Sequence, residues 1–237
     1  MIKELAFSVE RKLMRYFYRV LKIRPDSYPY LSGDFFVNIS DIKIEDIKDI
    51  FKLKGDLKNN LVFLKTELLP DFNQYCLDNQ CKDFILITHN SDKNTDFIIN
   101  NSDYVKPKLW LAQNYAGEES KIRALPIGLE NKRLYTNGIT KYFKKNEKNT
   151  PYLEKIFYKF TLETNIDARC EVYKLMRKHP LAETTGRKLN PRKYIDYMKR
   201  YYFCVAPEGN GLDTHRFWEC IYLNVVPISL RSKMTDY

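Results

Sequence analysis

A glycine-rich turn between an apolar run and an amphipathic run is the part of this sequence best suited to bind an anion. The stretch YYFCVAPEGNGLDTHRFWEC (201–220) passes from a strand pattern through Gly209 and Gly211 into a helical pattern that carries Arg216. Glycine lets the backbone turn tightly or approach a ligand closely, and the first turn of a helix presents N–H groups and a partial positive charge. A phosphate or a carboxylate is the kind of ligand that suits such a turn.

Two readings of the charged residues in this stretch are open. In the first, Arg216 binds a diphosphate, and Glu219 or Glu208 accepts hydrogen bonds from ribose hydroxyls. In the second, Asp213 caps the helix, and Arg216 and Glu219, one turn apart, form a surface salt bridge worth a few tenths of a kcal/mol. The spacing alone is compatible with both.

Composition describes a folded, basic protein. The 237 residues are 44% hydrophobic and carry a formal net charge of +10, which suits nucleic acid, anionic lipid or a phosphorylated small molecule as a partner. The five cysteines form no close CxxC ligand set, and their odd number argues against a disulfide framework. The sequence has no long apolar run and no signal-peptide pattern, so we expect a cytoplasmic protein.

The first 24 residues predict a basic amphipathic helix. Apolar side chains recur at helical spacing between Leu5 and Leu21, and five basic residues are distributed around them. Such a helix can lie on an anionic membrane surface, or it can pack against its own domain. The basic residues are Arg11, Lys12, Arg15, Arg19 and Lys22.

The rest of the chain alternates between strand and helix patterns and predicts an α/β fold. Short apolar runs read as buried, parallel strands at 34–40, 61–69, 83–92, 109–115 and 122–129, and again at 155–164, 202–206 and 225–230. Helices are expected at 167–178 and 190–200, the second with Asn190 as N-cap and Pro191 at its first position. The polar, lysine-rich segment 137–152 predicts a boundary between domains at 1–150 and 151–237, each a doubly wound unit, with a cleft between them.

The order of residues in the glycine-rich turn resembles a known family. PEGNGLDTHRFWE (207–219), followed by VVPI (225–228), is similar to the signature of exostosin-like glycosyltransferases and more distantly to that of α-1,3-fucosyltransferases. LITHNSD (86–92), LWLAQN (109–114) and LPIGLEN (125–131) look like the N-terminal domain of the same group. The resemblance implies the GT-B architecture, in which two Rossmann-like domains face each other across a cleft. It also implies transfer of a sugar from a nucleotide sugar to a glycan acceptor, in the synthesis of a surface polysaccharide. Together with the cytoplasmic composition and the basic N-terminal helix, it suggests a lipid-linked acceptor at the inner face of a membrane.

The resemblance also implies which residues meet the donor, because GT-B enzymes hold the sugar nucleotide in the C-terminal domain. Arg169, at the start of the predicted helix 167–178, can meet a phosphate or can face solvent. The polar loop of Thr185, Gly186 and Arg187 is a weaker candidate for contact with the donor. The candidate donor-binding residues are Glu208, Asn210, His215, Arg216, Glu219, Asn165 and Arg169.

Catalysis of sugar transfer needs a general base that takes a proton from the acceptor hydroxyl. The predicted strand 83–92 ends with His89 and Asp92, at the carboxyl edge where clefts open in such sheets, so these two are the candidate catalytic residues. A histidine at a strand end can equally be a hydrogen-bonded structural residue. Glu118 and Glu119 are outlying candidates for contact with the acceptor.

No metal is expected at the site, because the sequence contains no Asp-x-Asp carboxylate pair and no His/Cys cluster with zinc spacing. Helix amides and arginine would stabilise the leaving diphosphate instead. The chain stops about ten residues after VVPI begins, whereas relatives continue, so the resemblance implies an incomplete donor domain. An inactive nucleotide- or carbohydrate-binding protein is therefore one alternative, and a nucleic-acid-binding protein is another.

Overall fold

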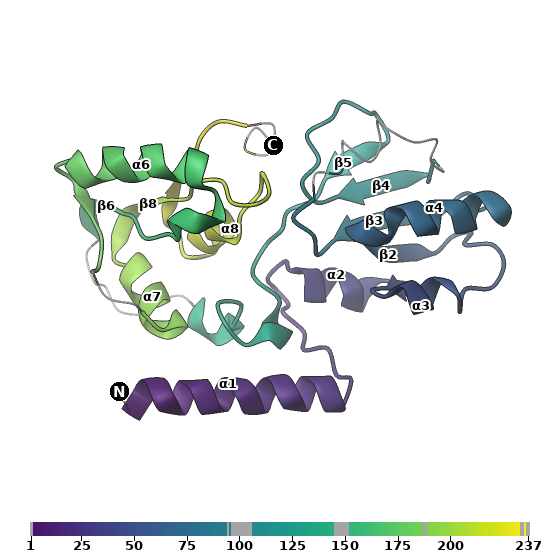
Figure 1. Cartoon of the computed structure of the whole chain (residues 1–237), viewed down its shortest axis with the longest axis horizontal. Coiled ribbons are helices and arrows are strands. Elements are labelled where there is room, and N and C mark those ends of the chain that lie inside the picture. Colours follow the sequence, from purple (N-terminus) through teal and green to yellow (C-terminus); the bar gives the residue numbers. More distant parts are fainter. Residues whose placement is uncertain are drawn as a thin grey trace. The chain divides into compact units, whose positions relative to one another are not determined.

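The computed structural model of the chain is an α/β protein with two parallel sheets (Figure 1). It describes residues 2–93, 95, 106–144, 152–186, 189–232 and 235. The chain divides into two compact units, each built from segments that are far apart in sequence. Unit 1 comprises Met1–Asp34, Gly128–Asn210 and Thr214–Leu230, and unit 2 comprises Phe35–Ile127, Gly211–Asp213 and Arg231–Tyr237.

Unit 2 is built around a five-stranded parallel sheet in which the strands follow the chain order β1-β2-β3-β4-β5. One apolar cluster, from Ile44 to Ile122, fills its core and includes the fully buried Val62, Leu64 and Trp110. Burying each such side chain contributes roughly 1.5–3 kcal/mol. The elements of this unit are α2 (Gly33–Ile39, which begins in unit 1), β1 (Ile42–Ile44), α3 (Ile47–Ile50), β2 (Leu61–Lys65), η1 (Thr66–Leu68), α4 (Leu69–Asp78), β3 (Ile85–His89), β4 (Leu109–Ala112) and β5 (Ile122–Ala124).

Unit 1 holds a four-stranded parallel sheet with the order β7-β6-β8-β9. Successive strand residues point to opposite faces of a sheet, and in β8 Cys204 joins an apolar cluster with α7 and α8, while Val205 joins one with α6. Helices therefore cover both faces, as in doubly wound folds. The elements are α1 (Ile2–Val20), η2 (Lys132–Leu134), η3 (Thr140–Tyr142), β6 (Leu153–Phe157), η4 (Leu162–Thr164), α6 (Ile166–Lys178), β7 (Ala182–Glu183), α7 (Pro191–Met198), β8 (Tyr201–Val205), α8 (His215–Tyr222) and β9 (Val226–Ile228).

The linear division at residue 150 is wrong. Leu129 and Phe143 belong to the same apolar cluster as Phe157 and Cys204, and Tyr30 packs against that cluster. The first 34 residues and residues 128–144 therefore belong to the unit of the second sheet. Residues 145–151 of the expected boundary segment lie outside the described residues.

Two local predictions are also wrong. A strand is expected at residues 34–40, but residues 34–39 lie in α2, because a short apolar run has the same appearance in a buried strand and in a buried helix. The second is the reading in which Asp213 caps the helix that carries Arg216: α8 begins at His215, and its N-cap is Thr214. Asp213 is not a cap, since its Oδ2 accepts a hydrogen bond from the Ile127 amide at 2.7 Å.

Candidate functional site

Two arginines from different helices meet at the carboxyl edge of the unit 1 sheet. Nη1 of Arg216, on α8, donates to the carbonyl of Lys159 at 2.7 Å, and Nη1 of Arg169, on α6, donates to the carbonyl of Thr161 at 2.7 Å. The two acceptors are two residues apart in the segment that follows β6. This edge is where doubly wound folds bind their ligands.

Arg216 is enclosed by an acidic and an aromatic neighbour. Its Nε lies 3.3 Å from Oε2 of Glu219, and its guanidinium lies 4.5 Å from the centre of the Tyr194 ring. The Arg216–Glu219 pair expected from the spacing is present, but it is buried rather than on the surface, since the Glu219 side chain is 4% exposed. Burial raises the pKa of Glu219, and the charge of Arg216 opposes that rise.

Arg169 is buried as well, with 9% of the residue exposed, so the alternative of a solvated helix face is wrong. Its Nε donates to the carbonyl of Glu208 at 2.7 Å. Burial lowers the pKa of Arg169, and the nearby charge of Arg216 lowers it further. In the part of the chain that the structure describes, Arg169 forms no ion pair, so a cation at this edge lacks a carboxylate partner.

The glycine turn after β8 lies tightly against these groups. Asn165, the N-cap of α6, accepts a hydrogen bond from the Ala168 amide, and its Nδ2 donates to the Gly209 carbonyl at 2.9 Å. A Cβ atom on Gly209 would lie 3.2 Å from Nη2 of Arg169. The loops after β6 and β8 are thus held together by Asn165 and Arg169. Glu208 is half-buried, and Asn210 is exposed.

His215 opens α8 but points to the backbone of its own unit. Its Nδ1 lies 2.9 Å from the carbonyl oxygen of Gly128. Thr214, the N-cap, makes no side-chain hydrogen bond to the first turn of the helix. The start of α8 therefore has no side-chain cap, while the imidazole position is set by the backbone at residue 128.

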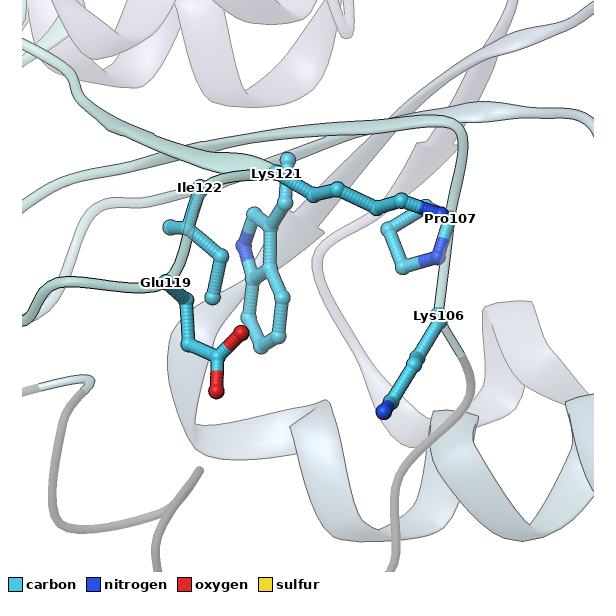
Figure 2. Close-up of a pocket in the computed structure, with 6 residues that line it drawn as sticks. Lys106, Pro107, Glu119, Lys121 and Ile122 are labelled. Carbon is cyan, nitrogen blue, oxygen red and sulfur yellow. The ribbon is translucent and has the colours of Figure 1, made fainter.

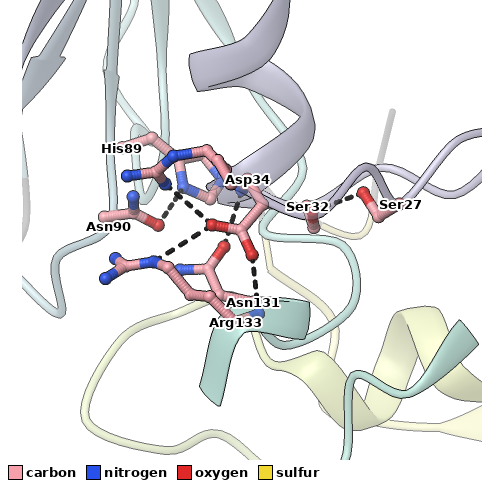
Figure 3. A network of polar contacts seen from close by, with 8 residues as sticks. Ser27, Ser32, Asp34, His89, Asn90, Asn131 and Arg133 are labelled. Carbon is pink, nitrogen blue, oxygen red and sulfur yellow. Dashed lines mark hydrogen bonds and ion pairs between the residues drawn. The ribbon is translucent and has the colours of Figure 1, made fainter. Parts of the chain in front are cut away.

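The predicted base residues lie at the carboxyl end of β3 in unit 2. His89 is buried, and its Nδ1 lies 3.2 Å from Oδ1 of Asn90 (Figure 3). Its Nε2 lies 3.2 Å from the Pro126 carbonyl. Both ring nitrogens thus face protein acceptors, which is the setting of a structural histidine. Asp92 is exposed. A base at either residue stays a prediction, and Asp92 is the one of the two that a substrate can reach.

A small pocket in unit 2 lies next to β4 and β5 (Figure 2). Its volume is about 20 Å³, which is room for one or two water molecules and far too little for a sugar nucleotide. Glu119, one of the outlying candidates for acceptor contact, lines it. The lining residues are Lys106, Pro107, Trp110, Glu119, Lys121 and Ile122.

Sequence reasoning missed the groups that position the two arginines. The carbonyls of Lys159 and Thr161 lie in a segment expected to be strand, and Tyr194 lies on an apolar helix face with no sign of contact to Arg216. The weaker candidate Arg187 lies outside the described residues. Among those described, no group of three His, Cys, Asp or Glu side chains is placed to hold a metal ion.

Compared with protein-family models and with curated proteins, the chain has no match. Within the described residues, no helix is both long and apolar enough to cross a membrane.

Proposed function

We propose that this protein is a glycosyltransferase of GT-B type that transfers a sugar from a nucleotide sugar to a glycan acceptor, and that the carboxyl edge of the unit 1 sheet binds the donor's diphosphate. The observation that carries the proposal is the meeting of Arg169 and Arg216 at this edge. Two like charges in a buried setting repel each other, and a bound anion removes that cost.

The chemistry of the surrounding groups supports a diphosphate. Each guanidinium has five N–H donors, more than the two hydrogen bonds given for each above, so donors remain for phosphate oxygens. The uncapped first turn of α8 adds a partial positive charge beside Arg216. In sugar transfer, these groups would stabilise the negative charge that develops on the leaving diphosphate. The resemblance of residues 207–219 to exostosin-like enzymes supports the same reading.

In this proposal Glu219 does not make the ribose contact that one reading of the sequence predicts. Its carboxylate is buried against Arg216, so it orients the guanidinium. The half-buried Glu208 is the better placed of the two acidic residues for a ribose hydroxyl.

Binding is tested with nucleoside diphosphates and sugar nucleotides in a thermal-shift series followed by calorimetry, because a ligand of the folded state raises its melting temperature. We expect Arg169→Gln to weaken binding at least about tenfold, which is about 1.4 kcal/mol. Arg177→Gln, an exposed position on the same helix, is the matched control and should bind as the parent does. Circular dichroism checks that both variants are folded.

Four results would count against the enzyme. Failure of every nucleotide to bind, or equal binding by folded Arg169→Gln, removes the diphosphate site. Binding without release of nucleoside diphosphate in the presence of glycan acceptors favours an inactive binding protein. Tight binding of single-stranded nucleic acid that is insensitive to Arg169→Gln favours the nucleic-acid alternative.

A further inference from the structure

Helix α1 presents an apolar stripe to solvent. Leu13 is 63% exposed and Tyr16 is 67% exposed, and Val9, Phe17 and Val20 are each about half exposed. Positions 9, 13, 16, 17 and 20 lie on one side of an α-helix. Exposed apolar patches of this kind mark surfaces that bind a partner or a membrane.

The opposite side of α1 is fixed to unit 1. The Phe7 ring stacks on the Tyr135 ring with their centres 6.3 Å apart, and Tyr135 Oη donates to Oε1 of Glu10 at 2.5 Å. Lys141 lies 3.9 Å from the same carboxylate, and Arg15 donates to the Leu134 carbonyl. These contacts hold the helix on one face and leave the apolar stripe (Val9, Leu13, Tyr16, Phe17 and Val20) pointing outward.

Basic residues flank the stripe along the helix. Lys12 and Arg19, seven positions apart, are exposed and lie along one edge of it. An apolar stripe with a basic flank complements a surface that has anionic groups on the outside and an apolar layer beneath them. An anionic phospholipid bilayer has this structure.

We propose that the apolar stripe of α1 docks on an anionic phospholipid bilayer, with the helix lying along the membrane surface. Residues of the stripe would enter the boundary between head groups and acyl chains, while Lys12 and Arg19 meet lipid phosphates. Because α1 is not apolar enough to cross a membrane, attachment in this manner is peripheral and reversible. The surface would act in this way whether or not the nucleotide site binds its donor.

The test is co-sedimentation of the full chain with vesicles of phosphatidylcholine and phosphatidylglycerol, and with vesicles of phosphatidylcholine alone. We expect binding to the anionic vesicles that weakens strongly between 0.1 M and 1 M salt, as the screening length falls from about 10 Å to about 3 Å. The double variant Leu13→Ser/Phe17→Ser should bind at least about tenfold more weakly, because two exposed apolar side chains can no longer be buried in lipid. Lys12→Glu/Arg19→Glu should lose the preference for anionic vesicles.

The matched control is Leu77→Ser/Leu175→Ser, which removes two exposed leucines from α4 and α6 and should bind as the parent does. Circular dichroism and size-exclusion chromatography with light scattering accompany each variant. The proposal is overturned if the parent binds no vesicles, or if folded Leu13→Ser/Phe17→Ser binds them equally well. It is also overturned if the parent is a dimer that Leu13→Ser/Phe17→Ser dissociates, because a second copy of the chain then covers the stripe.

Discussion

At the scale of single residues, Asp34 joins distant segments of unit 1, although the sequence did not single it out. Its fully buried carboxylate lies 2.7 Å from Arg24 Nη1 and 3.0 Å from Arg133 Nε, and its amide donates to Oδ1 of Asn131 (Figure 3). Burial raises the pKa of Asp34, and hydrogen bonds and charges from the two arginines oppose the rise. The carboxylate therefore ties the N-terminal segment to residues 131–133.

We expect Asp34→Ala to lower the free energy of unfolding by about 3 kcal/mol, because removing one partner of a buried pair leaves the other charges without compensation. Asp196→Ala is the control, since Asp196 pairs with Arg192 at 3.9 Å on the exposed side of α7 and should cost less than about 1 kcal/mol. Urea unfolding of both variants measures the difference. Equal losses would show that the Asp34 cluster contributes no more than a surface pair.

Sequence spacing predicts local pairs and not distant ones. Arg216 and Glu219 are three positions apart, so their pairing followed from helix geometry. Asp34 and Arg133 are 99 positions apart, and no periodicity connects them. Sequence spacing does not predict burial either. Glu219 and Arg169 are buried because other segments of the chain pack over them.

At the scale of elements, the turn at Gly128 requires glycine. Its φ is +65°, and a Cβ atom there would lie 2.2 Å from the carbonyl oxygen of Leu31. The adjacent Leu129 amide donates to that same oxygen at 2.8 Å. The N-terminal segment can thus approach the chain at 128 only where no side chain intervenes.

Gly128→Ala should therefore destabilise the protein by about 2 kcal/mol or more, through both the positive φ and the clash with backbone. Gly186→Ala is the matched control, because a Cβ atom at Gly186 meets nothing within 4 Å and no positive φ is required. We expect that control to be neutral or to stabilise slightly, by reducing the entropy of the unfolded chain. Thermal unfolding of both variants makes the comparison, and a similar melting temperature for the two would contradict the close approach.

The helices predicted well include one whose first residues carry a recognisable N-terminal capping pattern. Asn190 caps α7 with Pro191 at the first position, and α6 follows the expected range within one residue. The element predicted wrongly, α2, is a short apolar run, and its Asp34 and Phe36 contact parts of the chain that are distant in sequence. Asp213 does not cap α8, because its carboxylate accepts a hydrogen bond from the Ile127 amide instead.

At the scale of the whole molecule, the sequence predicted two parallel α/β units, and the structure has two parallel sheets. The division of the chain between them was not predictable from composition. The lysine-rich segment 137–152 suggested a linker, but Phe143 within it is fully buried in the cluster of Phe157. Part of the core of unit 1 comes from residues that precede unit 2 in the chain. Such long-range packing leaves no periodic signal in the sequence.

Because the core of unit 1 draws on distant segments, we predict that the two halves of the chain differ in their ability to fold alone. The core cluster of unit 2 lies entirely between Ile44 and Ile122, so a fragment of residues 35–127 contains all of it and should unfold cooperatively in urea. A fragment of residues 151–237 lacks Leu129, Phe143 and Tyr30, and removing several buried side chains at about 2–5 kcal/mol each exceeds the stability of a typical small domain. We expect that fragment to show no cooperative transition by circular dichroism. If 151–237 unfolds as cooperatively as 35–127, the segments 1–34 and 128–144 are not part of the core that stabilises the second sheet.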